Sequence, residues 1–144
     1  MQYNPYAAKA YQQINVQSLS PGEQVARLLE TAAKHIARAR AHAEAREFEQ
    51  RFYATEDAMK IINGLQGCLN ADPQASSVRA TLENYYAGVI LLISRINIRN
   101  DVGACDAAIT SLKTMAETWR EAEKIAQSNH EAAASVGHLD ATIC

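Results

Sequence analysis

The side chains in this sequence that could most readily take part in catalysis or bind a metal are its histidines. Helical di-iron sites need a glutamate three residues before a histidine, and zinc proteases need a His-Glu-x-x-His segment; neither spacing occurs here. One segment, HIARA, places a histidine in the middle of an expected helix, as phosphotransfer bundles do. Those bundles usually carry Lys and then Gly at the third and fourth following positions, where this chain has Arg38 and Ala39. The missing Gly would otherwise let a partner's active site approach closely. The sequence therefore predicts no metal site and leaves phosphotransfer through His35 as an alternative. The four histidines are His35, His42, His130 and His138.

Other catalytic and nucleic-acid signatures are also absent from the sequence. The glycines are scattered, so no phosphate-binding loop is formed, and the serines and cysteines have no local signature of a nucleophile. Arg38, Arg40, Arg46 and Arg51 alternate with glutamates, which is typical of a solvated, salt-bridged surface. The net charge of −2 and the pI near 6.1 give no long-range attraction for nucleic acid. We therefore expect a protein that is not an enzyme, has no cofactor and binds no nucleic acid.

The composition is that of a single helical domain. Of 144 residues, 48% are apolar and 21% charged, with only 6 Gly and 3 Pro to form turns. The three cysteines form no Cys-x-x-Cys pair, so we expect a reducing compartment in which Cys68 and Cys105 act as small core residues. The N-terminus lacks a secretory signal, and the longest apolar run, residues 87–93, is too short to cross a bilayer. These observations predict a cytoplasmic protein without membrane insertion.

The apolar periodicity predicts four long helices. Residues 1–19 show no period and are expected to form a flexible N-terminal arm. Ser20-Pro21-Gly22-Glu23 matches a capping box that opens the first helix. The second helix starts near Arg46 or Glu47, with Phe48 and Phe52 on the apolar stripe that is expected to face the core. The third helix runs over about 77–99, and Asn100 and Asp101 form the next turn. The fourth helix ends near residue 127, and residues 128–144 form a short helix or a frayed tail. The predicted fold is all-α, an antiparallel up-down four-helix bundle over 20–127, possibly with a short fifth helix.

The third helix is apolar almost all round, which a plain bundle does not require. Its expected core stripe is Val78, Leu82, Tyr85, Val89, Leu92 and Ile96, broadened on one side by Tyr86, Ile90 and Ile93. Leu91 and Ile98 fall on roughly the opposite face. Either a fifth helix or the arm covers them, or they line a groove for a partner helix. The periodicity leaves both explanations open.

Four segments, in order, resemble the FliS family of flagellin-specific export chaperones. They are AYQQINVQSLSPGEQVARLLETA, AMKIINGLQGCLN, LENYYAGVILLISRINIRND and SLKTMAETWREA. The resemblance covers about residues 11–126 and implies an antiparallel bundle without enzymatic activity. It implies binding of the disordered C-terminal region of flagellin in the cytoplasm, which prevents premature polymerisation and assists type III export. The first helix departs from the family, with Ala26 and Arg27 where large apolar residues are usual. The implied partner is therefore a flagellin, a divergent flagellin or a related secreted subunit, together with the flagellar export machinery.

The periodicity and the resemblance together suggest which residues contact the partner. In the arm, Tyr11, Ile14 and Val16 are expected to dock on the bundle. The expected groove residues of the second and third helices are Ile61, Leu65, Tyr86, Ile90, Leu91, Ile93, Asn97 and Ile98. The protein is expected to be a monomer or a weak homodimer. A self-associating structural bundle, in which the extra apolar face makes a homodimer, is the remaining alternative.

Overall fold

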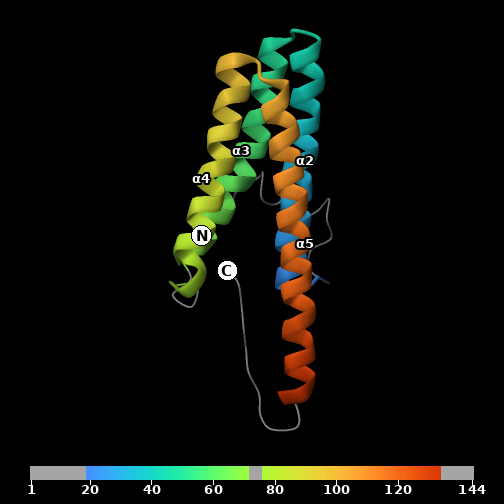
Figure 1. Ribbon diagram of the computed structural model, residues 1–144, viewed down its shortest axis with the longest axis vertical. Helices are drawn as coiled ribbons and strands as arrows, with labels where there is room; N and C mark the ends of the chain where they lie inside the picture. The colour runs from blue at the N-terminus through green and yellow to red at the C-terminus, as the bar shows by residue number, and fades with distance from the viewer. Residues whose placement is uncertain (1–18, 72–75, 134–144) are drawn as a thin grey trace, which may run out of the picture.

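In the computed structural model, the described residues 19–71 and 76–133 form four α-helices packed as an antiparallel bundle (Figure 1). The helices are α2 (Pro21–Glu44), α3 (Phe48–Ala71), α4 (Ser76–Arg99) and α5 (Val102–Ala133). These described residues contain no strand, so the predicted all-α, up-down bundle is confirmed. Residues 128–133 simply continue α5. The predicted arm and the last part of the tail, residues 1–18 and 134–144, lie outside the described residues.

The start of α2 is capped as the sequence predicts. Ser20 is extended (φ −62°, ψ 157°), its hydroxyl accepts a hydrogen bond from the Glu23 amide at 3.3 Å, and a proline opens the first turn. The carboxylate of Glu23 turns to Arg120 on α5, at 2.9 and 3.2 Å. The amide of Gly22 donates to the carboxylate of Glu123 on α5 at 3.2 Å, and a Cβ on Gly22 would lie 2.5 Å from that oxygen. The first turn of α2 is therefore fixed to α5 as well as capped.

Two residues with positive φ end helices at the other end of the bundle. After α2, the Arg46 amide donates to Ala43 and the Glu47 amide to His42, the paired bonds of a Schellman motif. Arg46 takes the left-handed conformation (φ 59°) that glycine usually occupies there. The sequence-based expectation for the next turn is confirmed, since Asn100 has φ 51° and the Asp101 side chain accepts from the Ala104 amide at 3.0 Å.

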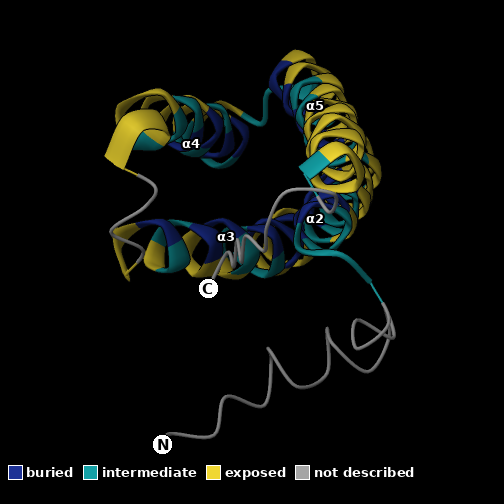
Figure 2. Cartoon of the chain, turned by 90° about the horizontal axis from the view of Figure 1, so that it is seen from below, coloured by how far each residue is buried: buried dark blue, intermediate teal, exposed yellow. Residues whose placement is uncertain are grey.

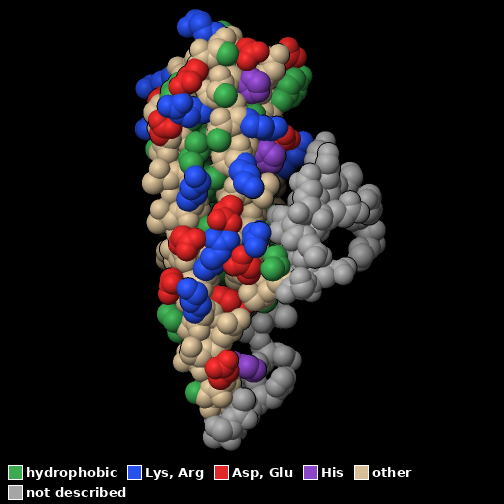
Figure 3. Space-filling view, turned by 90° about the vertical axis from the view of Figure 1, so that its right-hand side faces the viewer, with side chains coloured by type: hydrophobic (Ala, Val, Ile, Leu, Met, Phe, Trp, Pro, Cys, Tyr) green, Lys and Arg blue, Asp and Glu red, His purple; other side chains and the backbone are tan. Residues whose placement is uncertain are grey.

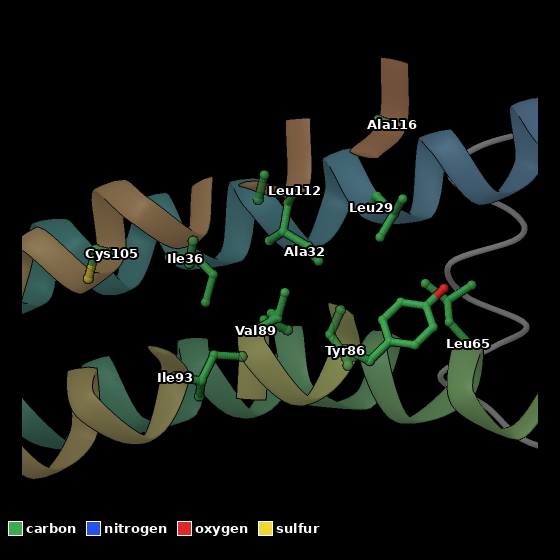
Figure 4. Packing of buried hydrophobic residues seen from close by; sticks show 14 of the residues in the cluster. Leu29, Ala32, Ile36, Leu65, Tyr86, Val89, Ile93, Cys105, Leu112 and Ala116 are labelled. Carbon is green, nitrogen blue, oxygen red and sulfur yellow. The ribbon is translucent and has the colours of Figure 1, made fainter. Parts of the chain in front are cut away.

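The core runs along the inner faces of all four helices (Figures 2 and 4). Leu29, Ala32 and Ile36 of α2 are completely buried, in the same core cluster as Leu112 and Ala116 of α5. Most of the core positions of α2 are alanine, which allows the helix axes to approach closely. α2 packs most extensively, against α5 and α3, whereas α4 makes fewer contacts with its two neighbours. α2 is thus the central helix of the bundle and α4 its most lightly attached one.

The two described cysteines differ from each other. Cys105 is a free thiol that is completely buried in the core, as expected, and burial raises its pKa to about 11. Cys68 is half-buried near the end of α3 and is held in a disulfide. The expectation that Cys68 acts only as a small core residue is therefore wrong, because local spacing does not show a pairing between distant positions.

Candidate partner-binding surface

The outer side of α4 exposes two large aliphatic side chains. Leu91 is 56% exposed and Ile98 is 80% exposed. They are seven residues apart and therefore lie on one face, about 10 Å from each other along the helix. These two side chains take the positions predicted from the helical period, on the face opposite the core. They form the apolar centre of the candidate surface.

Two aromatic side chains of α3 lie near the C-terminal end of α4, where Arg51 of α3 bonds Asn97 and Asn100. Phe48 and Phe52 are 45% and 46% exposed, so the prediction that they are buried is wrong. Thr55 marks the side of α3 that faces α4, because its hydroxyl accepts from the Asn97 amide at 2.9 Å. At about 100° per residue, Phe52 lies beyond Thr55 on the outer side of α3. We call Phe48, Phe52, Ile90, Leu91 and Ile98 the α3–α4 surface.

Three predicted groove residues are in the core instead. Tyr86, Ile93 and Leu65 are 2%, 3% and 8% exposed, and all three point into the interior (Figure 4). Burial raises the pKa of Tyr86 to about 12. The expectation that they line an open groove is corrected by this burial. The predicted core stripe of α4 is rotated accordingly, since Val78 is 48% exposed whereas Tyr86 and Ile93 are central.

The remaining predicted residues of the bundle are half-buried. Ile61 and Ile90 pack against the edge of the core. Asn97 lies in a polar network: its amide bonds Thr55, and its carbonyl accepts from Arg51 at 3.0 Å. Asn97 therefore positions α4 against α3, a role that no spacing in the sequence indicates because its partners are more than 40 residues away.

The buried guanidinium of Arg51 ties three helices together at this end of the bundle. It is 8% exposed and also donates to the Asn100 side chain at 2.8 Å. The Asn100 amide in turn donates to the carbonyl of Ala43 at the end of α2, at 3.0 Å. The guanidiniums of Arg51 and Arg46 lie 5.1 and 5.4 Å from the Phe48 ring centroid, which holds this aromatic at the edge of the surface.

The other end of the bundle, at the start of α2, is fixed by charged side chains. The guanidinium of Arg120 donates to Glu30 at 2.6 and 3.0 Å and to Glu23 on the same helix. These hydrogen bonds lower the pKa of both carboxyls. The Gln24 side chain also donates to the carbonyl of Leu19 at 2.9 Å, so the chain is held up to the first described residue. The predicted arm residues Tyr11, Ile14 and Val16 lie outside the described residues.

The α2–α5 side of the molecule is charged (Figure 3). Lys, Arg, Asp and Glu side chains are interspersed on this face (Figure 3), with pairs such as Arg40 with Asp106 at 2.7 Å. His35 is half-buried, and burial, followed by the charge of Arg38, lowers its pKa. Ala39, which stands where a phosphotransfer bundle has glycine, is completely buried. Within residues 19–71 and 76–133, no group of three metal-binding side chains comes together, and no helix has the length and hydrophobicity of a membrane span.

Comparison with known proteins gives one match. A protein-family model described as "Flagellar protein FliS" matches residues 2–126, which is most of the chain. No curated protein and no solved structure matches this chain. The matched range includes all of α2, α3 and α4 and most of α5.

Proposed function

Because the chain belongs to the FliS family, whose members are flagellar export chaperones, we propose that it binds the disordered C-terminal region of flagellin. In this role it acts in the cytoplasm, prevents premature polymerisation of flagellin and assists delivery to the type III export machinery. The observation that carries the proposal is the α3–α4 surface, where Leu91 and Ile98 are exposed on the helix that the rest of the bundle holds least.

The energetics of this surface suit coupled folding and binding. Complete burial of a Leu, Ile or Phe side chain contributes about 1.5–3 kcal/mol. Since Leu91, Ile98, Phe48 and Phe52 are each about half exposed or more, each offers a partner about 1–2 kcal/mol. Ordering a disordered segment costs about 2–5 kcal/mol or more, so several of these side chains have to be covered together. A segment that spans both α3 and α4 meets this requirement.

The division of labour along the chain follows from this proposal. Residues 20–127 form the bundle that presents the surface, and residues 1–19 form an arm whose Tyr11, Ile14 and Val16 dock on it. Ile61 and Ile90 contact the partner at the edges of the surface. Tyr86, Ile93, Leu65 and Asn97 hold the helices beneath it and affect binding through the packing of α4.

The test is a titration of the protein with a flagellin C-terminal segment, in which binding is measured by isothermal titration calorimetry. Leu91→Asp and Ile98→Asp are each expected to weaken binding by about 30-fold or more, which corresponds to about 2 kcal/mol of lost burial and added charge desolvation. Ile125→Asp is the matched control, because Ile125 is 61% exposed but lies on α5. Circular dichroism should show unchanged helicity and melting in all three variants. Unaltered binding in both α4 variants would refute the assignment of the surface.

The same experiment distinguishes the alternatives. If the protein is a self-associating structural bundle, sedimentation will show a stable dimer that the flagellin segment does not dissociate or enlarge. A 1:1 complex supports the chaperone function. Phosphotransfer through His35 receives no support from the half-buried, charge-paired surroundings of this residue.

A further inference from the structure

Two arginines border the apolar side chains that α4 exposes. Arg95 and Arg99 are both exposed, and within residues 19–71 and 76–133 neither guanidinium has a hydrogen-bond or salt-bridge partner. No other charged residue occurs in the range 84–100. We propose that the flagellin segment binds the α3–α4 surface as an amphipathic helix, with an apolar stripe over Leu91 and Ile98 and an acidic edge paired with the two arginines.

The two arginines lie on one side of Leu91. Tyr85 marks the side of α4 that faces α5, because its hydroxyl donates to a carbonyl of α5 at 3.1 Å, and Asn97 marks the side that faces α3. At about 100° per residue, Leu91 lies midway between these two sides, about 120° from each. Arg95 and Arg99 lie about 80° and 40° from Tyr85, so they form a basic border on the α5 side of the exposed leucine.

The bundle gives a local role to only one of these charges. Arg99 is in the last turn of α4, where a positive charge is favourable next to the negative end of the helix dipole. Arg95 lies one turn earlier, and the like charge four residues away repels it. The carboxylates that follow in the chain are engaged elsewhere, since Asp101 caps α5 and Asp106 pairs with Arg40. Arg95 is therefore a charge that the fold itself does not use.

The opposite border of the surface is acidic. Glu49 and Glu56 lie within one turn of Phe52 on α3, and among the described residues neither carboxylate forms a salt bridge. A partner helix therefore meets positive charge along its edge toward α5 and negative charge along its edge toward α3. This asymmetry determines which edge of the partner carries acidic side chains, and so sets the rotation of that helix about its own axis.

The spacing of the arginines defines what the acidic edge looks like. Arg95 and Arg99 are four residues apart, which is about 6 Å along the helix axis. A helix that runs along α4 presents two carboxylates at this separation when they are also four residues apart. The identity of this partner as flagellin rests on the proposed function, whereas the preference for an acidic edge rests on the surface itself.

The preference is tested with two synthetic helical peptides that have the same apolar stripe. One carries Glu and the other Lys at the two edge positions. At about 0.01 M ionic strength, where the Debye length is about 30 Å, we expect the full chain to bind the acidic-edge peptide about 10-fold more tightly. The difference should vanish at about 1 M, where the Debye length is about 3 Å. Leu91→Asp should abolish binding of both peptides, which locates them on this surface.

Charge variants of the chain identify the residues responsible. Arg95→Glu combined with Arg99→Glu should reverse the preference, and Arg95→Gln combined with Arg99→Gln should remove it. The matched control is Lys34→Glu combined with Lys113→Glu, which changes the net charge by the same amount at two exposed positions of α2 and α5 and should leave the preference unchanged. Circular dichroism should show the same helicity in all of them. The flagellin segment should bind the first variant about 10-fold more weakly at low salt, mainly because association is slower.

Several results would overturn the proposal. They are equal binding of the two peptides, a preference that the arginine variants retain, and binding of anionic lipid vesicles through the arginines without binding of either peptide. If the flagellin segment binds the wild type and the arginine variants equally, the proposed function stands and the acidic edge is refuted. If the acidic-edge peptide is selected but the flagellin segment does not bind, the preference of the surface stands and the proposed function fails.

Discussion

Arg120 is the side chain whose charge should contribute most to the stability of the bundle. It is 21% exposed and donates five hydrogen bonds to three carboxylates, those of Glu23, Glu30 and Glu117. Glu117 is 69% exposed and adds little, whereas Glu23 is only 24% exposed. Buried hydrogen bonds to charged groups contribute about 1.5–3 kcal/mol, and exposed pairs contribute about 0.2–1 kcal/mol. For this partly screened cluster, we expect Arg120→Met to lower the free energy of unfolding by about 1–2 kcal/mol at pH 7.

The pH dependence separates the charge of Arg120 from its packing. Arg120 lowers the pKa of Glu23 and Glu30 below their usual value of 4.5, mainly through its hydrogen bonds. Their stabilising contribution is therefore present above about pH 4.5 and is lost as the pH falls through the lowered values. The difference between wild type and Arg120→Met should be measured by urea unfolding at pH 7 and should largely vanish near pH 3. Lys124→Met is the control, because the Lys124–Glu121 pair is 73% and 66% exposed and should contribute less than about 0.5 kcal/mol. A loss of the same size at both pH values would show that packing of the arginine stem, and not its charge, is responsible.

Two further predictions concern the opposite end of the bundle. Arg46→Gly should be more stable to urea than Arg46→Ala, with a free energy of unfolding higher by about 1 kcal/mol. Both variants lose the contact with Phe48, but only glycine relieves the strain of the left-handed backbone (φ 59°). Equal stability of the two variants would show that this conformation is not strained. Arg51→Ala should cost about 2–4 kcal/mol in urea unfolding, because it leaves the carbonyl of Asn97 and the Asn100 side chain without their buried donor. A cost below about 1 kcal/mol would mean that water replaces the guanidinium.

The helix ends could be predicted from sequence because their determinants are local. Ser20 and Asp101 cap the amides three residues ahead of them, and Asn100 takes a conformation that few residues other than glycine adopt. Each of these interactions lies within a few positions along the chain. The same reasoning did not predict the main partner of the Glu23 carboxylate, because that partner, Arg120, is 97 residues away.

The orientation of α4 could not be predicted in the same way. A helical period fixes the angles between residues but not the direction of the neighbouring helices, and a helix that is apolar all round offers no polar face to set that direction. Leu91 and Ile98 were therefore placed correctly on the face opposite the core. Tyr86 and Ile93 were predicted to line the groove, whereas they are buried in the core. The exposure of Phe52 has a similar cause. Phe52 lies on the outer side of α3, beyond the side that faces α4. Its exposure becomes evident only when the position of α4 relative to α3 is known.

The bundle is held at its two ends by polar contacts and along its axis by the alanine-rich face of α2. At one end Arg51 and Asn100 join α2, α3 and α4, and at the other Arg120 and Glu123 join α5 to the start of α2. None of these contacts uses Leu91, Ile98 or Phe52. The fold therefore does not depend on these three exposed side chains, and a charge placed at Leu91 or Ile98 should change binding without changing stability. This independence is what a chaperone needs if it is to remain folded both before its partner arrives and after the partner leaves.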